Sequence, residues 1–314
     1  MITAEKTSLP RHWVAEGNVE ERLAEDRSVP RKAWRHGWLM GWRDVCRASD
    51  DRTVIATVLP RTAVGHTQPL LLPVSADGPM HALLANLSAF VLDFAARQKV
   101  QGAHLTYTYL EQLPVLPPAT YDLSAPWTQD AHLADWIRPR VLELTYTSYE
   151  MAPWAKYLGD DGPPFVWDER RRFLMRAELD AAYFHLYGIE RADVDLVLDS
   201  FRAFKNKQPA VFQDTKDEII RVYEAMAEGR PFTHPSLTPP PAQGPRHPPG
   251  TSPLTRVIPA GGPPKHPTAP ASKKKRRGKS APDQLGGGLF GLDEVEGGDI
   301  QLDMLNLFGE GEQK

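Results

Sequence analysis

Apolar residues in the first third of the chain form short runs that are typical of β-strands. The run RTVIATVLP at residues 52–60 is rich in β-branched side chains and ends at a proline, and LLLPV at residues 70–74 is a second apolar run. β-Branched residues pack well on a pleated surface, and a proline tends to mark the end of a strand. The two runs therefore predict a small β unit.

Helical periodicity begins after the turn at residues 77–79. Apolar side chains recur at three- and four-residue spacing, at Leu83, Leu84, Leu87, Phe90, Val91 and Phe94. This spacing predicts a helix of about 18 residues with one face in the core. Residues 105–118 alternate at first and end in prolines, which predicts a strand and an extended exit. A short helix is also expected around residues 19–25.

Three further helices are predicted in the second half of the chain, after a segment over residues 133–149 in which Pro139 begins or kinks a helix. Residues 173–187 end at a glycine, and residues 191–201 carry apolar side chains on one face. The sequence Thr215-Lys-Asp-Glu218 has the pattern of a capping box at the start of a helix. These helices predict a compact bundle.

The composition changes after residue 229. Of the 30 prolines 15 lie in residues 230–314, as do 13 of the 23 glycines, with almost no periodic apolar pattern. Such a segment cannot bury enough apolar surface to offset the entropy of ordering its backbone. The sequence therefore predicts an α+β protein in four parts: a polar lead-in (1–39), a small mixed α/β domain (40–118), a helical bundle (119–229) and a disordered tail (230–314).

Charge is distributed unevenly although the net charge is only −3. Residues 1–118 carry 13 basic and 12 acidic side chains, whereas residues 119–229 carry 13 basic and 20 acidic ones. A surface for a polyanionic partner is therefore expected in the first of these sections. Cys46 is the only cysteine, which excludes an internal disulfide and suits a reducing compartment. No run approaches the roughly 18 apolar residues of a spanning helix, so a cytoplasmic protein without a membrane partner is expected.

Common catalytic patterns are missing from the sequence. It contains no GxGxxG, no GxxxxGK[ST] and no HExxH, and its ten histidines are scattered. The neighbouring Asp160 and Asp161 lie in the stretch LGDDGPP, where aspartate is favoured by turn geometry alone. Cys46 is expected to be a small buried apolar residue. The sequence therefore indicates no catalytic residue and no metal site.

Polar and basic side chains suited to nucleic acid are concentrated between residues 43 and 112. Arginine and lysine bind phosphates and guanine acceptors, and glutamine can pair with adenine. A solvated surface without a ligand would have the same composition. The set comprises Arg43, Arg47, Arg52, Arg61, His66, Gln68, Arg97, Lys99, Gln101, His104, Tyr107 and Gln112.

Several ordered blocks of this sequence resemble one enzyme family. Residues 42–65 and 84–118 are similar to the target-recognition region of type IIG restriction-modification enzymes and adenine-specific DNA methyltransferases, a family active in phage defence. The second block holds an Arg-x-Lys-x-x-Gly motif (Arg97 to Gly102) and a closing Gln-Leu-Pro (Gln112 to Pro114). Residues 175–188, 197–201 and 214–216 resemble the helical section that ends such proteins.

The chain departs from this family in its chemistry. The family's catalytic domain binds S-adenosylmethionine and holds a flipped adenine with an Asn-Pro-Pro-aromatic motif. Neither feature is present here; Asp161-Gly-Pro-Pro164 and Leu116-Pro-Pro118 lack the asparagine. The resemblance therefore implies a recognition portion without a cofactor of its own, S-adenosylmethionine being bound by a separate methyltransferase or endonuclease subunit or domain.

The resemblance also implies a set of DNA-binding residues. Arg97 and Lys99 are expected to bind phosphate, and loop residues are expected to contact base edges. An ion pair between Arg97 and Asp93, four residues apart on a helix, is the alternative for Arg97. The complete expected set is Arg43, Arg52, Thr53, Arg61, His66, Gln68, Arg97, Lys99, Gly102 and His104.

Two segments of the tail suggest further contacts. Residues 272–279, SKKKRRGK, are suited to loose phosphate binding. The sequence Gln301-Leu302-Asp303-Met304-Leu305, followed by Asn-Leu-Phe308, resembles the peptide with which bacterial DNA enzymes hold the sliding clamp. A terminal amphipathic turn that docks on the chain's own bundle is the alternative.

The function expected from these observations is the positioning of a separate catalytic domain on duplex DNA, in methylation or restriction. Two alternatives remain open. One is a stand-alone hydrolase that uses Asp160, Asp161 and a nearby histidine. The other is a protein-interaction subunit without DNA contact, for which the acidic helical section would be suited.

Overall fold

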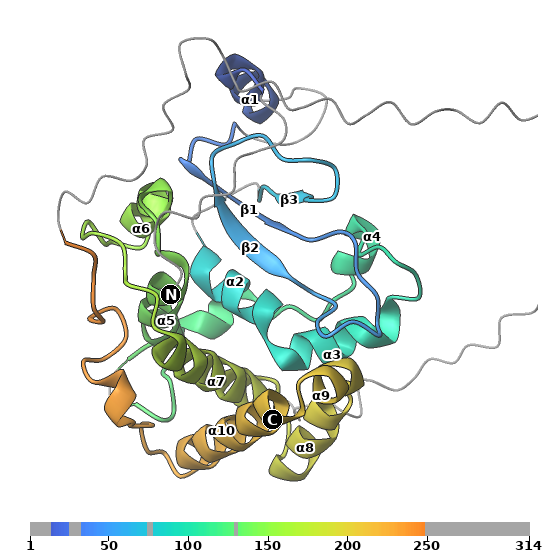
Figure 1. The fold of residues 1–314 in the computed structure, drawn as a ribbon, viewed down its shortest axis with the longest axis vertical. Helices are drawn as coiled ribbons and strands as arrows, with labels where there is room; N and C mark the ends of the chain where they lie inside the picture. The colour runs from blue at the N-terminus through green and yellow to red at the C-terminus, as the bar shows by residue number, and fades with distance from the viewer. Residues whose placement is uncertain (1–13, 25–32, 74–77, 129–130, 249–314) are drawn as a thin grey trace, which may run out of the picture. The chain divides into compact units, whose positions relative to one another are not determined.

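The computed structural model describes residues 14–24, 33–73, 78–128 and 131–248. Within these ranges α-helices accompany one three-stranded antiparallel sheet, so the predicted α+β class is confirmed (Figure 1). The residues expected to form two domains, 40–118 and 119–229, lie in one compact unit, Met1–Thr255. None of the described helices is long and apolar enough to cross a membrane.

The sheet has the strand order β2-β1-β3. Its strands are β1 (Trp38–Trp42), β2 (Ala56–Pro60) and β3 (Leu70–Leu71). The strand predicted at 52–60 forms over its second half, and the one predicted at 70 onward forms over two residues. The central strand β1 was missed: all five of its residues are buried, so its sequence WLMGW lacks the alternation by which a half-exposed strand is recognised.

Gly41 allows the segment before β3 to approach the central strand closely. A Cβ atom at this position would lie 2.2 Å from the carbonyl oxygen of Pro69 and 3.1 Å from Nε2 of Gln68. No side chain fits at the first of these distances, so a larger residue would push residues 68–70 away from the sheet. The glycine therefore positions the loop that holds two of the expected DNA-binding residues, His66 and Gln68.

The single long helix predicted after residue 79 is two helices, α2 (Met80–Ser88) and α3 (Phe90–Lys99). The break is at Ala89, whose ψ of 144° is extended. The N–H of Phe90, at the start of α3, donates to Oδ1 of Asp180 at 2.8 Å. A distant carboxylate thus caps α3, and no local pattern could reveal a cap supplied 90 residues later in the chain.

The strand predicted from residue 105 is wrong. A single bridge pairs Val45 with His104, after which the chain forms the short helix α4 (Tyr107–Leu110). The carbonyl of Leu105 accepts a hydrogen bond from Nε1 of Trp42 at 2.7 Å. Tertiary contacts of this kind therefore outweigh the alternating pattern of the sequence in setting the local conformation.

The remaining helices, apart from α1, lie in the second half of the described chain. Pro139 lies inside α5, and α10 begins at Pro209, six residues before the predicted capping box. The box is wrong because proline is well suited to the first turn of a helix, and the hydroxyl of Thr215 donates to the carbonyl of Val211 instead. These helices are α1 (Glu16–Leu23), α5 (Leu133–Thr145), α6 (Ala152–Tyr157), α7 (Glu169–Leu186), α8 (Arg191–Asp199), α9 (Arg202–Lys207) and α10 (Pro209–Ala227), with 3-10 turns at Pro118–Asp122, Tyr149–Met151 and Pro235–Leu237.

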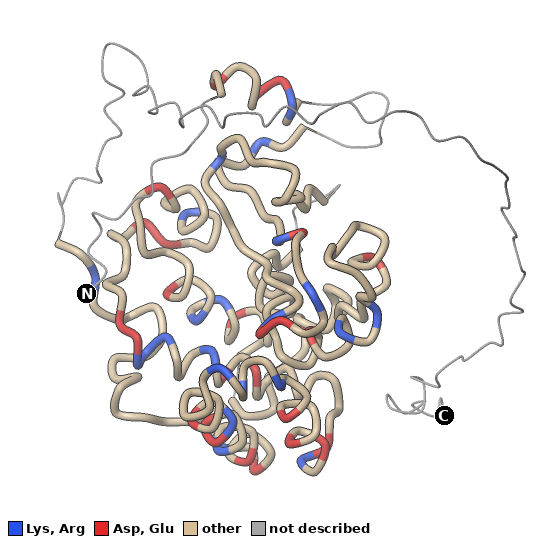
Figure 2. The backbone as a smooth tube through the Cα atoms, turned by 45° about the vertical axis from the view of Figure 1, so that its right-hand side comes forward, with Lys and Arg blue, Asp and Glu red and all other residues tan. Residues whose placement is uncertain are grey.

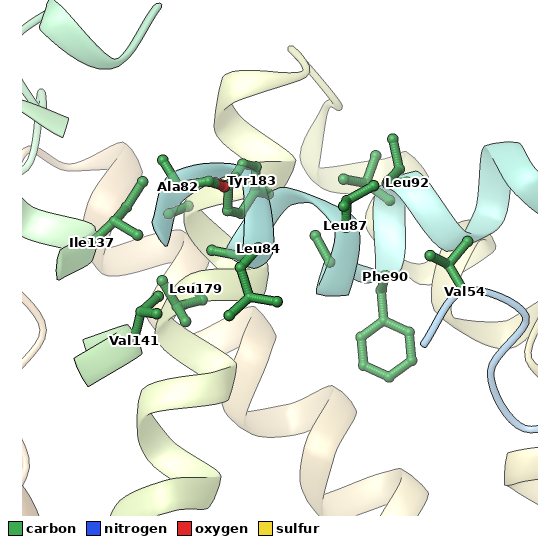
Figure 3. Packing of buried hydrophobic residues seen from close by; sticks show 14 of the residues in the cluster. Val54, Ala82, Leu84, Leu87, Phe90, Leu92, Ile137, Val141, Leu179 and Tyr183 are labelled. Carbon is green, nitrogen blue, oxygen red and sulfur yellow. The ribbon is translucent and has the colours of Figure 1, made fainter. Parts of the chain in front are cut away.

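The core joins the first half of the described chain to the second. Figure 3 shows Leu84 of α2 next to Val141 of α5 and Leu179 of α7. Burial of one such side chain contributes about 1.5–3 kcal/mol, so the many apolar residues in this cluster dominate the stability of the fold.

A buried polar network crosses the boundary predicted at residue 118. Asn86 of α2 donates to the hydroxyl of Tyr187 at 2.8 Å and accepts from the N–H of Leu116 at 3.0 Å. The hydroxyl of Tyr183 donates to the carbonyl of Ala82 at 2.7 Å, and burial raises the pKa of Tyr121 beside it to about 12. Buried polar groups need partners, so this network fixes one arrangement of α2 against α7.

Residues 230–248 belong to the fold, which corrects the predicted start of a disordered tail at residue 230. The buried guanidinium of Arg171 forms a bidentate pair with Glu143 at 2.7 and 3.0 Å. The same guanidinium donates to the carbonyls of Ser236 and Pro239 at 3.1 and 2.8 Å. Residues 230–248 therefore pack on the fold despite their proline content, because their carbonyl groups satisfy a buried charge. Residues 249–314 lie outside the described ranges.

Candidate nucleic-acid interface

Three segments that are distant in the sequence lie side by side beyond β1. Residues 42–47 pair with residues 101–108 through Cys46 N to Ala103 O (3.0 Å) and Leu105 N to Asp44 O (2.8 Å). They also bond to residues 65–70, through Trp42 N to Pro69 O (3.2 Å) and Asp44 N to Thr67 O (3.0 Å). We call the exposed side of these segments the three-segment surface; it presents Arg43, Val45, Arg47, His66, Gly102, His104 and Tyr107.

Strand alternation orients the first of these segments. From residue 42 to residue 47, buried or half-buried positions alternate with exposed ones. Successive side chains of an extended chain point to opposite faces, so Arg43, Val45 and Arg47 share the outer face while Trp42 and Cys46 anchor the segment in the core. The side chain of Arg43 is 44% exposed and lies 3.7 Å from Asp50, a distance that leaves the guanidinium free to move.

His104 is an exposed ionisable group of the segment at residues 101–108. Its Nδ1 lies 2.6 Å from Oδ2 of Asp44, while 59% of its side chain is exposed to solvent. The Asp44 carboxylate is only 14% exposed, so it orients the ring from below. The opposite ring nitrogen, Nε2, can therefore donate or accept at the surface.

Gly102 lies at the rim of this surface. A Cβ atom at this position would have no heavy atom within 4 Å among its described neighbours, so the fold does not require glycine there. The absence of a side chain leaves the backbone open to close approach by a ligand. On the other side, Tyr107 is 51% exposed and donates through its hydroxyl to the carbonyl of Leu70 at 3.0 Å.

The loop at residues 65–70 brings two further expected residues to the surface. His66 is exposed, whereas Gln68 is half-buried and its Nε2 is enclosed without a hydrogen-bond partner among the described residues. Unsatisfied amide nitrogens are rare in folded proteins. The side chain of Gln68 therefore lies beneath the loop, next to Gly41, and not at the tip of the loop.

The structure brings five of the ten expected residues together: Arg43, His66, Gln68, Gly102 and His104. A sixth, Lys99, is half-exposed in the last turn of α3, two residues before the segment at residues 101–108. Sequence reasoning placed Arg47 and Tyr107 in the polar set without assigning them to the site, and it passed over Val45. The alternation of residues 42–47 is the signal that could have found Arg47 and Val45.

Arg97 is a structural residue, which corrects its expected role as a phosphate ligand. Its side chain is only 7% exposed and pairs with Asp93 at 3.3 Å, as the alternative interpretation has it. Its other nitrogens donate to the carbonyls of Ala48, Asp50 and Asp51 at 2.7–3.0 Å. The guanidinium also lies 4.0 Å from the centre of the Phe201 ring. The guanidinium of Arg97 is therefore engaged within the fold, whereas the guanidinium of Arg43 is exposed.

Arg52 and Thr53 are likewise engaged in the fold rather than at the surface. Nε of Arg52 donates to Asp93 at 2.6 Å, and Nη2 donates to the carbonyl of Ser88. Thr53 is completely buried, and its N–H donates to both oxygens of Asp93 at 3.0 and 3.1 Å. A buried threonine cannot line a DNA-facing surface, so that part of the expected site is wrong.

Arg61 is also held by the protein. It forms a bidentate pair with Glu20 of α1 at 2.8 and 2.7 Å. Its Nη1 donates to the carbonyls of Trp34 and His36 at 2.6 and 3.0 Å. The side chain, 20% exposed, therefore joins α1 to the sheet and does not extend into the loop that contains His66.

The structure also shows the surroundings of the residues considered for catalysis, Asp160, Asp161 and Cys46. Both carboxylate oxygens of Asp160 accept from Arg246, at 2.9 and 2.6 Å, while Asp161 is exposed. Cys46 is buried, and burial raises its pKa to about 11, so the thiol stays protonated at neutral pH. The described residues contain no group of three or more His, Cys, Asp or Glu side chains that could hold a metal ion.

Acidic and basic positions alternate along the helices drawn at the bottom of Figure 2, which are the C-terminal helices α7 to α10 of Figure 1. Several of these charges are paired, for example Lys216 with Asp195 and Asp199 at 2.7 and 2.8 Å. Pairing at exposed positions contributes little to stability and leaves little net field. The exposed arginines of the three-segment surface are therefore the stronger candidates for a polyanionic ligand.

The partner motif Gln301 to Leu305 and the basic run at residues 272–279 lie outside the described residues. No family model, no characterised protein and no solved structure matches this chain at a significant level.

Proposed function

We propose that this chain binds duplex DNA as the target-recognition portion of an adenine-specific DNA methylation or restriction system, and that a separate domain or polypeptide binds S-adenosylmethionine and transfers the methyl group. The observation that carries the proposal is the convergence of Arg43, Arg47 and His104 on one exposed surface from segments 60 residues apart. The similarity of residues 42–65 and 84–118 to such recognition regions supports it.

Each part of the three-segment surface has a role in this proposal. Arg43 and Arg47, on the outer face of one extended segment, bind two phosphates that are not adjacent, because residues four apart in a strand are separated by about 13–14 Å. His104 and the loop residue His66 contact base edges, where donors and acceptors distinguish the base pairs, and Gln68 supports the loop from beneath. Val45 and Tyr107 supply apolar contacts of the kind that the thymine methyl group makes.

The central test compares the salt dependence of DNA binding by the full chain and its variants. Each phosphate neutralised contributes a slope of about −0.9 to a plot of log K against log salt concentration. The double variant Arg43→Ala/Arg47→Ala should therefore lower the magnitude of the slope by about 2 and weaken binding at least about tenfold. Fluorescence anisotropy with a labelled duplex measures both quantities.

The matched control is Arg138→Ala/Arg221→Ala, which removes two arginines that are 41% and 56% exposed and lie on α5 and α10. It changes the net charge equally, so it should leave the slope nearly unchanged. An equal loss of affinity in both double variants would indicate a general effect of charge. An unchanged affinity of Arg43→Ala/Arg47→Ala would contradict the proposal.

A second test uses shape and leaves the charge constant. A leucine side chain at Gly102 has space in the free protein, because nothing described lies within 4 Å of its Cβ position. Gly102→Leu should therefore keep the melting temperature of the wild-type chain while weakening duplex binding by steric exclusion. Binding that is unaffected by this bulky side chain would place the DNA elsewhere.

The contact with a sliding clamp through Gln301 to Leu305 is a separate part of the proposal and rests on sequence similarity alone. Deletion of residues 301–308 should abolish binding to a bacterial clamp in a pull-down while duplex binding persists. Retention of clamp binding after the deletion would remove this partner from the proposal.

A further inference from the structure

A cavity of about 460 Å³ lies away from the three-segment surface, among β2, the junction of α2 and α3, α5, α7, α9 and α10. These elements gather around one region of the fold in Figure 1. The volume is in the range of small-molecule sites, and the walls are largely apolar. They include Val58, Leu84, Val141, Leu144, Phe204 and Val211.

One side of the cavity is a charged stripe on α7. Arg172, Arg176 and Asp180 all line it and follow one another at four-residue spacing, with Phe173 and Ala177 beside them. Residues four apart lie on the same helix face, so the two guanidinium groups are neighbours. Like charges in this arrangement destabilise a helix, and among the described residues the ion pair of Arg176 is a long one, with Glu169 at 3.7 Å.

Arg172 is the most informative member of the stripe. Its Nε and Nη1 are buried and have no hydrogen-bond partner among the described residues. Its guanidinium lies 3.6 Å from the centre of the Trp167 ring, and burial, assisted by the charge of Arg176, lowers its pKa to about 10. Two buried guanidinium nitrogens without an acceptor are costly to the fold, so the position of Arg172 is best explained by an anionic ligand that supplies acceptors.

The other end of the stripe has the opposite character. Asp180 is buried and accepts from the N–H of Phe90 at 2.8 Å, and burial raises its pKa to about 6 despite the nearby Arg52. A carboxyl group in this state can still accept hydrogen bonds from the amino or imino groups of a ligand. Arg172 and Asp180 are eight residues apart, which is about 12 Å along the helix axis.

We propose that this cavity binds a purine mononucleotide, with the phosphate at Arg172 and Arg176 and the base lying on the apolar walls toward Asp180. A phosphate group alone is much shorter than the distance between the two ends of the stripe. A nucleotide joins an anion to a planar base whose amino and imino groups donate hydrogen bonds, which matches both ends and the apolar middle. The inference is independent of DNA binding, since the cavity and the three-segment surface share no residue.

Isothermal titration and thermal shift of the full chain test this inference with four probes: AMP, GMP, adenosine and inorganic phosphate. AMP or GMP should bind and raise the melting temperature in proportion to the logarithm of its concentration above the Kd. Adenosine, which lacks the phosphate, and inorganic phosphate, which lacks the base, should each bind at least about tenfold more weakly, because each loses one set of contacts. Failure of both nucleotides to bind, or equal binding of all four probes, would overturn the inference.

Two variants locate the site. Arg176→Gln changes a side chain that is 52% exposed, so the fold tolerates it, and it should weaken nucleotide binding about tenfold or more. Arg138→Gln, 41% exposed and outside the cavity, is the control and should bind as the wild type does. Equal affinity in Arg176→Gln and in the control would exclude the cavity as the site.

Arg172→Gln separates binding from a structural role. Removal of a guanidinium with two buried nitrogens that lack hydrogen-bond partners among the described residues should leave the melting temperature of the free chain unchanged or higher, while nucleotide binding is lost. A lower melting temperature combined with full nucleotide affinity would show that Arg172 serves the fold, and it would overturn the inference. Duplex binding should be unchanged in both cavity variants.

Discussion

The guanidinium of Arg52 donates to the carboxylate of Asp93 at 2.6 Å, and the side chain of Asp93 is completely buried. The same carboxylate accepts from Nε of Arg97 and from the N–H of Thr53. One buried charge on α3 thus holds two arginines and the backbone that leads into β2. Three residues that resemble DNA ligands in the sequence are engaged by this one aspartate.

Replacement of Asp93 should therefore be strongly destabilising. Asp93→Asn keeps the shape of the side chain but removes the negative charge, leaving two arginines without their counter-ion, and it should cost about 3–5 kcal/mol of unfolding free energy. Urea denaturation of the full chain measures the change. Asp135→Asn, which breaks an exposed pair with Arg138, is the control and should change stability by less than about 1 kcal/mol. A small effect of Asp93→Asn would contradict the central role of this carboxylate.

Truncation should show that residues 230–248 are part of the fold. A chain that ends at residue 229 loses the carbonyls of Ser236 and Pro239 around the buried Arg171, and it also loses the N–H of Ala242 that donates to Glu143 at 2.9 Å. Leaving such buried groups unsatisfied costs about 1–3 kcal/mol each. The chain 1–229 should therefore unfold at a clearly lower temperature than the chain 1–248 in calorimetry. Equal melting temperatures would show that this segment contributes nothing to stability.

His81 should make the stability depend on pH in the acidic range. Burial lowers its pKa from 6.5 to about 4, while its Nε2 donates to the carbonyl of Ala134 at 2.9 Å. Because the folded state binds the proton less readily than the unfolded state, the contribution is complete above pH 6.5 and is lost as the pH falls toward 4. The loss should amount to about 3 kcal/mol.

The variant His81→Gln isolates this contribution, because glutamine can donate to the same carbonyl but does not titrate. The difference in unfolding free energy between wild type and variant should shift by about 3 kcal/mol in favour of the variant between pH 6.5 and pH 4. Urea denaturation at intervals of pH records it, and the other titrating groups cancel in the difference. A constant difference over this range would mean that His81 does not titrate as its burial requires.

Asp44 should limit the affinity of the three-segment surface for DNA. It places a negative charge 2.6 Å from His104 and opposes the arginines on either side of it in the sequence. Asp44→Asn keeps a hydrogen-bonding partner for His104 and should raise duplex affinity about fivefold at low salt, which corresponds to about 1 kcal/mol. This gain in affinity should become smaller as the salt concentration rises, because salt already screens the repulsion between Asp44 and the phosphates in the wild type. Lower affinity in the variant would show that the orientation of His104 matters more than the charge.

The sequence predicted the fold where the local pattern and the tertiary environment agree. Residues 173–187 carry periodic apolar side chains and end at a glycine, and α7 ends within one residue of the predicted position, at Leu186. The helix α8 begins at the predicted Arg191 and ends at Asp199, two residues before the predicted end. Prediction failed where a distant group intervened, as at Ala89, where Asp180 caps a new helix, and after His104, where Trp42 and Leu70 hold the chain in a turn.

Prediction of the candidate site also failed where a distant group intervened. Residue type and the family resemblance selected ten polar or flexible positions, and an arginine satisfies the same description whether it faces solvent or a buried carboxylate. Arg43 and His104 reach the surface, whereas Arg52, Arg61 and Arg97 are held by Asp93, Glu20 and backbone carbonyls. These partners lie 41 residues away in two cases, so no window of sequence could have paired them.

By itself, the sequence determined the α+β class and the presence of the helices α7, α8 and α10, because periodicity and composition act locally. Tertiary structure alone decided which arginines are exposed, where residues 230–248 pack and that α7 lines a cavity with Arg172, whose Nε and Nη1 have no hydrogen-bond partner among the described residues. The physical reason is that the cost of burying a charge depends on the partners brought to it from elsewhere in the chain, and those partners are known only once the chain has folded.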